Sequence, residues 1–548
     1  MTVTHEPAIP PAEPAAIEPG PQRAAAPPLP ARLLAAALAL AAIAVVLVSV
    51  PSRLFDLDRH SVPKELVVHV AGLLSLLWLL RGRRAPRAGV VEVLLAAFVA
   101  WSGLSALLAE NRWISIRAAG LTYSAFLVFL AARRLADEGA GRLALGGLGL
   151  AAIAGAAIGA AQAYGLNLEW LTDDRPPGGT FGNRNFLAHF AAISTPLLLL
   201  LALRARRPLA RTVWLAGLAV ASCAIVLTRS RAGWLGLGAG LGVFGVAWLL
   251  ARRETRATSG RGLRRAAALI VAGGLAAIVV PNRLDWRSDA PYAETLTRLT
   301  DYRSGSGRGR LIQYENTLRL ARDYPVLGVG PGNWFVHYPR VTTRGDRAFS
   351  ASDPIPTNPW PSSDWVALLA ERGVPAALLA LGAAGAAILV SLRRLRGEDA
   401  AVAMAAMAVL ATLAAAFVTG AFDAVLMLAP PAFFVALTVG LLLPPTRPIA
   451  ERRLVGRRRT VLATFMAVTA VAVLLLDTAQ LAAIRITRDS TARSTVERAL
   501  RYDPGNYRLR LLLAGRGSCR QRLEHARVAA RLLPYHAAPR AALRACGG

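Results

Sequence analysis

The stretch NFLAHFAAISTPLLLLLALRARRPLAR, residues 185–211, decides the fold class of this chain. Residues 185–203 are uncharged and mostly apolar, and about 20 such residues cross the hydrocarbon core of a bilayer as a helix. Arginines follow at once, at positions 204, 206, 207 and 211. Basic residues in short connections favour the cytoplasmic side of a membrane. The stretch therefore predicts a membrane-spanning helix that ends in a cytoplasmic loop.

The same pattern recurs along the chain. Apolar residues make up 55% of the 548 residues, and the mean hydropathy is positive. We therefore expect an all-α integral membrane protein rather than a series of soluble domains. We predict about 13 transmembrane helices, at 31–50, 65–80, 88–108, 117–132, 143–163, 185–203, 210–227, 232–250, 266–280, 374–392, 400–420, 429–443 and 460–482.

The positions of the arginines set the predicted topology. A net charge of +30 suggests nucleic-acid binding, but the arginines cluster in every second connection, as membrane topology requires. These connections are 81–87, 204–211, 252–265 and 447–459. We therefore predict that they and the N-terminus are cytoplasmic, and that no nucleic acid is a partner.

The domain organisation follows from this topology. Residues 1–30 are rich in Pro, Ala and Glu and are expected to form a disordered cytoplasmic tail. Residues 31–443 would form the membrane core, with a large outward loop at 281–363 that is too long for a simple connection. A basic cytoplasmic loop and the last transmembrane helix would fill 444–482, and a small helical tail outside the membrane would fill 483–548.

The predicted tail contains two helix corners, at residues 503–504 and 533–534, 30 residues apart. Helices that end in such corners at this period resemble tetratricopeptide hairpins, although a stable array usually has three repeats. Cys519 and Cys546 lie in the same segment, and in an oxidising compartment a disulfide between them would staple it.

One outward corner carries basic residues against the positive-inside trend. The stretch LTRSRAGW, residues 227–234, joins two predicted helices with barely a turn and contains Arg229 and Arg231. Arginine keeps its charge and binds phosphate through two parallel hydrogen bonds, so this pair suits a lipid-linked phosphate. The alternative is that both side chains reach the head groups of the outer leaflet.

Two further segments are candidate binding surfaces. GGTFGNRNFLAH, residues 178–189, places Arg184 at the start of a membrane helix, where backbone N–H groups favour anions; an ordinary capped helix start is the alternative. In the outward loop, an amphipathic helix over about 309–322 precedes a loop rich in glycine and aromatic residues that suits a sugar or a phosphate. A helix that lies on the membrane surface is the alternative. The predicted substrate loop comprises Gly330, Gly332, Asn333 and Trp334.

The stretch NPWPSSDWVALLAERG, residues 358–373, opens a helix that we predict over 362–393, with a serine as N-cap and Asp364 in its first turn. This helix would be about 48 Å long at 1.5 Å per residue, longer than the hydrocarbon core of about 30 Å. Its first turns would therefore project outward, with Glu371 and Arg372 near the interface.

The order of these motifs resembles the O-antigen ligase and O-antigen polymerase superfamily (Wzy_C-like). The motifs are TFGNRNFLA, LTRSRAGWLGL, GRGRLIQYENTLRLARDYPVLGVGPGNWFVHYP and SSDWVALLAERG, and the resemblance covers about residues 60–443. It implies a GT-C-like membrane glycosyltransferase, inverting and metal-independent, with no cofactor. Such an enzyme moves a glycan from undecaprenyl diphosphate to an acceptor at the outer face of the bacterial inner membrane. Tetratricopeptide-like tails also occur in this superfamily, and such a tail would bind a protein partner.

The resemblance also implies roles for single residues. Family arginines hold the diphosphate, and the matching positions are Arg229 and Arg231. The family has another arginine at the start of the loop helix, matched by Arg308 or Arg310, and Arg184 is a further candidate.

One position departs from the family pattern. Ligases of this family usually carry a His-Asn pair nine residues before the Glu of the closing Glu-x-Gly, and that His is often assigned as the base that activates the acceptor. Counting back from Glu371 gives Ser362, which accepts a proton poorly. Asp364, Asp353 or His337 would then be the base. Alternatively, the reaction needs little base because arginines neutralise the leaving diphosphate, or the activity has been lost or changed.

Three classes of function stay open. The first is a lipid-linked glycan transferase whose acceptor is lipid A-core, a growing glycan or a protein, that is, a ligase, a polymerase or a protein glycosyltransferase. A transporter would need polar residues in mid-membrane, which the first nine predicted segments almost lack. The third class is a non-catalytic scaffold for envelope glycan assembly that acts through its tail.

Overall fold

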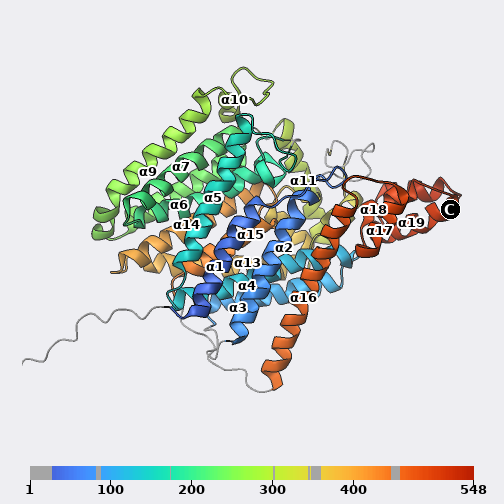
Figure 1. Ribbon diagram of the computed structural model, residues 1–548, viewed down its shortest axis with the longest axis horizontal. Helices are drawn as coiled ribbons and strands as arrows, with labels where there is room; N and C mark the ends of the chain where they lie inside the picture. Colours follow the sequence, from blue (N-terminus) through green and yellow to red (C-terminus); the bar gives the residue numbers. More distant parts are fainter. Residues whose placement is uncertain are drawn as a thin grey trace, which may run out of the picture.

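The structure is a computed structural model that describes residues 27–81, 88–172, 175–299, 301, 303–343, 346, 359–445 and 457–547. In these ranges it is a bundle of helices without a β-strand (Figure 1). Twelve helices are long and apolar enough to cross a membrane, and one shorter apolar helix, Ala429–Leu442, accompanies them. The predicted all-α membrane protein is therefore confirmed. Asp353 lies outside the described residues, and so do residues 1–26 of the expected disordered tail.

The apolar helices are α1 (Leu29–Leu47), α2 (Asp58–Arg81), α3 (Val90–Leu107), α4 (Arg112–Asp137), α5 (Arg142–Ala163), α6 (Arg184–Arg204), α7 (Pro208–Thr228), α8 (Arg231–Leu250), α9 (Arg253–Val279), α13 (Asp364–Arg394), α14 (Ala400–Phe422), α15 (Ala429–Leu442) and α16 (Arg457–Ile486). The short 3-10 helix η1 (Gly179–Phe181) precedes α6. The 281–363 loop contains α10 (Pro291–Thr297), α11 (Gly305–Asp323), α12 (Trp334–His337) and the 3-10 helix η2 (Tyr338–Arg340).

Helix α6 lies at the centre of the bundle. Of its most apolar stretch, 89% is buried, and α5, α7, α8 and α14 pack around it. Near its start, the ring of Phe190 contacts Phe181 at 5.2 Å and Phe434 at 5.5 Å between ring centroids. A helix that is apolar all round needs such complete cover by other helices. The residues at the start of α6 are therefore held by a helix that is packed on all sides.

The arginine-rich connection predicted over 252–265 is mostly helical, which corrects the sequence prediction. Helix α9 begins at Arg253, well before the predicted start at 266. Arginine favours helices, so a basic segment can extend a membrane helix into water. Trp248 at the end of α8 donates a hydrogen bond to Ser259 of this extension (2.9 Å), which holds it against the bundle.

Helix α13 is broken at Gly373, so the single straight helix predicted over 362–393 is wrong. Gly373 has φ 78° and ψ 175°, a conformation that favours glycine. A Cβ at this position would overlap the carbonyl group of Val326, because the 281–363 loop passes against the backbone here. The sequence prediction treated the length of the helix as continuous and missed this contact.

The break leaves helix carbonyl groups without their usual partners, and the loop supplies new ones. The carbonyl of Ala370 accepts a hydrogen bond from the N–H of Val329 (2.9 Å), and that of Glu371 accepts one from Gly330 (2.8 Å). The glycine-rich loop is thereby fixed to the first half of α13.

Glu371 and Arg372, which we predicted near the membrane interface, are buried among neighbouring elements. The Glu371 carboxylate accepts a hydrogen bond from the N–H of Trp334 (3.3 Å). Arg372 donates to the hydroxyl groups of Ser102 (3.1 Å) and Thr122 (3.0 Å). Buried charges need such partners, and both residues therefore join α13 to its neighbours.

Three polar residues meet inside the bundle between α2, α4 and α16. His69 lies 2.8 Å from the hydroxyl of Ser124 and 2.9 Å from the carboxylate of Asp477, and all three are buried. We expected almost no polar residues inside the first nine segments, and this cluster is an exception. It links three helices to one another, so it fixes α16 to the bundle.

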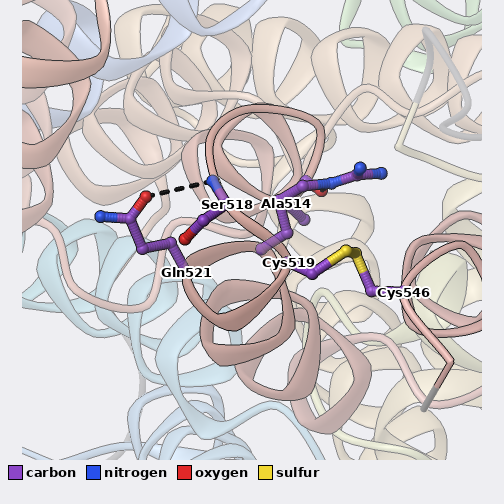
Figure 2. Close-up of a disulfide and its surroundings, with 6 residues drawn as sticks. Ala514, Ser518, Cys519, Gln521 and Cys546 are labelled. Atoms are coloured by element: carbon purple, nitrogen blue, oxygen red, sulfur yellow. Dashed lines mark hydrogen bonds between the residues drawn. A yellow bond between two sulfur atoms is a disulfide. The ribbon is translucent and has the colours of Figure 1, made fainter.

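The tail consists of four short helices that follow α16: α17 (Arg493–Tyr502), α18 (Tyr507–Ala514), α19 (Cys519–Leu532) and α20 (Ala537–Arg544). The corners between them fall at the two predicted positions, 503–504 and 533–534. Cys519 and Cys546 form a disulfide that joins the start of α19 to the residues after α20 (Figure 2). The likeness to tetratricopeptide repeats stays a prediction.

The tail is docked onto the bundle and the 281–363 loop. Asp503 accepts hydrogen bonds from Trp113 (2.6 Å) and Arg117 (3.1 Å) at the start of α4. Asn111, just before α4, donates to the carbonyl group of Leu532 (3.0 Å). In Figure 1 the tail helices lie at one side of the bundle, beyond α16. The ring of His536 lies 2.8 Å from the carbonyl oxygen of Phe335 in the loop. The tail is therefore in contact with both the bundle and the loop.

Candidate functional site

The corner between α7 and α8 presents two arginines at one end of the bundle, which we call the loop end because the 281–363 loop lies there. Arg229 has φ 52° and is the one non-glycine residue with positive φ in the described ranges. Such a conformation is uncommon for a side-chain-bearing residue, and this one terminates α7. Ser230 then caps α8 by accepting a hydrogen bond from the N–H of Gly233 (3.3 Å). The one-turn corner predicted from the sequence is confirmed.

Both guanidinium groups point to the 281–363 loop. Arg229 donates to the carboxylate of Glu294 and to the hydroxyl of Thr295, each at 2.9 Å. Arg231 donates to the carbonyl group of Asp301 (3.1 Å) and to the hydroxyl of Ser306 (3.0 Å), at the start of α11. The corner thus holds the first part of the loop through polar contacts.

Arg184 reaches the same place from the start of α6. The guanidinium groups of Arg184 and Arg229 each lie 4.8 Å from the centre of the Trp286 ring. The attraction between a cation and an aromatic face partly offsets the repulsion between two nearby arginines. Arg184, Arg229, Arg231 and Arg175 line a cavity of about 660 Å³. A concentration of fixed positive charge in one cavity suits a polyanion.

The other two predicted arginines differ from each other. Arg308 is exposed in the first turn of α11, and it does not line the cavity. Arg310, two residues further, is half-buried, and its charge acts on Asp423, but it does not line the cavity either. Of the alternatives Arg308 and Arg310, only Arg310 is thus linked to the surroundings of the cavity, through Asp423. A diphosphate contact by any of these arginines stays a prediction.

Asp364 holds a neighbouring loop in place. Its two carboxylate oxygens accept hydrogen bonds from the backbone N–H groups of Val425 (2.9 Å) and Leu426 (2.8 Å), between α14 and α15. Ser363 caps α13 by accepting a hydrogen bond from Trp365 (3.3 Å), as the sequence predicted for one of the two serines. With both oxygens engaged, Asp364 is placed to position this loop, and its role as a base stays a prediction.

Asp423 is an acid that the sequence prediction missed. It follows α14 directly, and Asn185 donates to its carboxylate (3.5 Å) from the wall of the arginine cavity. Burial raises the pKa of Asp423, and the positive charges of Arg310 and Arg175 act in the opposite direction. A general base works best when its pKa lies near the working pH, so the raised pKa suits proton uptake.

Ser362, which stands in the place of the family histidine, is held through its backbone. Its N–H donates to Gln313 of α11 (2.6 Å), and its carbonyl accepts from the hydroxyl of Tyr314 (3.0 Å). Tyr314 also donates to the carbonyl of Ala421, just before Asp423. The start of α13, the loop helix α11 and the Asp423 segment therefore meet at one point beside the cavity.

The predicted substrate loop is packed inside the protein. Asn333 and Trp334 are buried, and so is Gly330, while Gly332 is half-buried. Asn333 exchanges two hydrogen bonds with the backbone of Asn111 (2.9 and 3.1 Å), and the indole of Trp334 donates to Thr317 (2.9 Å). These contacts give the loop a structural role. Direct contact with a substrate stays a prediction.

His337 lies at the interface with the tail and not at the arginine cavity. It is buried, with the ring of Tyr535 at 5.1 Å on one side and that of Tyr324 at 5.5 Å on another. Burial, and secondly the charge of Arg340, lowers the pKa of His337 to about 4. The structure therefore does not bring this candidate base together with Asp364 and Ser362.

We expect acid to loosen the docked tail. The folded pKa of His337 lies below the ordinary value of about 6.5, so docking is fully favoured above pH 6.5 and loses stability as the pH falls toward 4. The protection factors of residues 507–545, which compare the measured hydrogen exchange with that of an unfolded chain at the same pH, should therefore fall between pH 7 and pH 4.5. His337→Phe keeps a ring but cannot take up a proton, so it should reduce this fall. An equal fall in both proteins would contradict the assignment to His337.

The sequence prediction missed several residues of the site. Asp423 could have been found, because it is the lone acid in the short connection between the predicted segments 400–420 and 429–443. Trp286, Glu294 and Arg175 come from loops without a recognised spacing, and only the fold brings them to the corner. In the described part of the chain, no three His, Cys, Asp or Glu side chains form a group suited to a metal ion.

Comparison with known proteins supports the resemblance in part. Residues 216–381 match the family model described as O-antigen ligase, a region that contains the arginine corner, the 281–363 loop and the first half of α13. No curated protein matches the chain. The match covers less than the span of 60–443 that the motifs suggested, and it does not include the tail. The chain is thus a multi-pass membrane protein with an O-antigen ligase family domain in residues 216–381.

Proposed function

We propose that this protein transfers a glycan from a polyprenyl-diphosphate carrier to an acceptor, as an O-antigen ligase-like enzyme of the bacterial inner membrane. One observation supports this more than any other. Arginines from α6 and from the α7–α8 corner converge on one cavity, and Asp423 lies beside it through Asn185. Positive charge for a leaving diphosphate and a base for an acceptor hydroxyl are the two requirements of such a transfer.

The proposed orientation places the loop end outside the cytoplasm. Helix α6 begins at the arginine cavity and ends at Arg204, so the basic connection 204–211 lies at the opposite end of the bundle. Basic connections favour the cytoplasm. The cavity and the tail would then face outward, where an undecaprenyl-diphosphate-linked glycan is presented.

The proposed reaction is a direct displacement. An acceptor hydroxyl attacks the anomeric carbon of the carrier-linked sugar while the bond from this carbon to the diphosphate oxygen breaks. The diphosphate leaves with the electron pair, and Arg229, Arg231 and Arg184 neutralise the charge that develops on it. The hydroxyl proton passes to Asp423. Attack from the face opposite the diphosphate inverts the anomeric configuration.

The acceptor is the finer part of the proposal. The matched family is described as O-antigen ligase, so we place lipid A-core ahead of a growing glycan or a protein. A polymerase would use the same carrier chemistry, and a scaffold would use the tail alone.

The surface glycan of a strain that lacks the protein tests the proposal. We expect the acceptor to lose all its long glycan chains while the carrier-linked glycan accumulates, and the full-length protein to restore the chains. Acceptor that carries a single repeat unit would indicate a polymerase instead. An unchanged glycan profile, measured by gel electrophoresis and mass spectrometry, would exclude glycan transfer as the function.

A further inference from the structure

The arginine cavity contains a carboxylate that the proposed reaction does not use. Glu294 of α10 accepts a hydrogen bond from Arg229 at 2.9 Å through one oxygen, and its other oxygen pairs with Arg298 at 3.0 Å. The hydrogen bond from Arg229 holds the pKa of Glu294 below its usual range, so the side chain is ionised at neutral pH. Glu294 therefore occupies the edge of Arg229 that a phosphate would need.

The helix that carries Glu294 is weakly held. Among the seven residues of α10 only Thr295 is buried, and Leu296 is 60% exposed. Helix α10 has no extensive interface with another helix in the described ranges. The corner holds it through the bonds from Arg229 to Glu294 and Thr295, and through a bond from Arg231 to the carbonyl of Arg298 at its end. Asn282 also donates to the hydroxyl of Tyr292 (3.1 Å). The side chain of Glu294 keeps 30% exposure, so another anion can reach its position.

The surroundings of such a corner contain anions of two kinds. The head group of a phospholipid is a phosphodiester with one charge, and it is present in large excess over any lipid-linked substrate. A diphosphate carries more charge and more acceptor oxygens, so it can bind Arg229 and its neighbours Arg184 and Arg231 at the same time. The single charge of Glu294 matches that of a phosphodiester but not that of a diphosphate.

We propose that Glu294 is a specificity-determining residue that keeps single-phosphate head groups out of the corner and gives way to a diphosphate. A phosphodiester gains little when it replaces a carboxylate that is already paired with Arg229. A diphosphate gains contacts with further arginines and displaces Glu294 together with α10. The inference rests on the proposed function, because it takes the diphosphate carrier as the substrate.

The test compares the full-length protein with Glu294→Gln in lipid nanodiscs, with inorganic pyrophosphate as the probe. Glu315→Gln is the matched control, because Glu315 forms an exposed ion pair with Arg319 on α11. Phosphatidylcholine is the reference lipid, because its choline offsets the charge of its own phosphodiester. In nanodiscs of phosphatidylcholine, Glu294→Gln should bind pyrophosphate about fivefold more tightly, the effect of removing one partly exposed ion pair. When phosphatidylglycerol is added, the affinity of Glu294→Gln should fall, while those of the wild type and Glu315→Gln should change little.

Two outcomes would overturn the inference, and only the second would also overturn the proposed diphosphate site. If Arg229→Gln abolishes pyrophosphate binding while Glu294→Gln matches the wild type in both lipid mixtures, the inference fails and the diphosphate site stands. If Arg229→Gln leaves pyrophosphate binding unchanged, the inference fails together with the proposed diphosphate site. Native mass spectrometry gives an independent readout, since Glu294→Gln should retain more bound phosphatidylglycerol than the wild type.

Discussion

Arg229→Gln is expected to reduce glycan transfer by about 100-fold or more, the usual effect of removing one group that stabilises charge in a transition state. The guanidinium lines the arginine cavity, beside Trp286 and Glu294. Glutamine keeps a polar side chain, but it is shorter and brings no charge to the leaving diphosphate. Arg229→Lys keeps the charge and loses the two parallel hydrogen bonds, so it should retain part of the activity.

The control is Arg319→Gln, since Arg319 is an exposed arginine of α11 outside the cavity. Each variant is expressed in the strain that lacks the protein, and the surface glycan is measured against the amount of protein in the membrane. The scaffold alternative makes the opposite forecast. If Arg229→Gln and Arg308→Gln left the glycan unchanged while removal of the tail abolished it, the protein would act as a scaffold.

Asp423→Asn is expected to lower the rate of transfer by about 10²- to 10⁴-fold, the range for loss of a general base. Asparagine has nearly the same shape, and its oxygen can still accept from the N–H of Ala424, so only the long contact with Asn185 (3.5 Å) is lost. We therefore expect the thermal stability of the purified protein to change little. Initial rates of transfer and a thermal unfolding curve for the same preparation measure both effects.

Asp364→Asn tests whether Asp364, the base that the sequence suggested, acts in place of Asp423. The Asp364 carboxylate accepts hydrogen bonds from Val425 and Leu426 through its two oxygens, and an amide can accept only through one. This variant should lose stability and displace the segment that carries Asp423. If Asp364→Asn kept its stability but lost the rate of transfer, while Asp423→Asn stayed active, Asp364 would be the base. Full transfer by Asp364→Asn would exclude it as the base.

The helices of the bundle could be predicted because a bilayer demands long apolar segments, and the basic connections mark where they end. The corner at Arg229 was also predictable, because so few residues separate α7 from α8. The break at Gly373 was not, since it depends on a loop segment that approaches from outside the helix. Hydropathy describes the contact of a helix with lipid, and it does not show where a loop will pack against that helix.

The site was predictable where it lies on helix ends and unpredictable where it depends on loops. Arg184, Arg229 and Arg231 are at ends of membrane helices, so their common position follows from topology. Glu294 and Trp286 reach the same cavity through the path of a long loop, which no spacing in the sequence encodes. The candidate base moved from Asp364 to Asp423 because two backbone N–H groups hold the oxygens of Asp364 at 2.8–2.9 Å, whereas one oxygen of Asp423 has only a long contact with Asn185 (3.5 Å).

The buried cluster of His69, Ser124 and Asp477 has a consequence for how the chain is assembled. Asp477 follows the apolar stretch of α16, and its buried carboxylate pairs with His69 of α2, which in turn contacts Ser124 of α4. Helices α2 and α4 are synthesised before α16. The carboxylate of Asp477 is therefore buried with its partner only after those two helices are in place. Since the tail follows α16 directly, it takes up its position only on a chain whose first helices have assembled correctly.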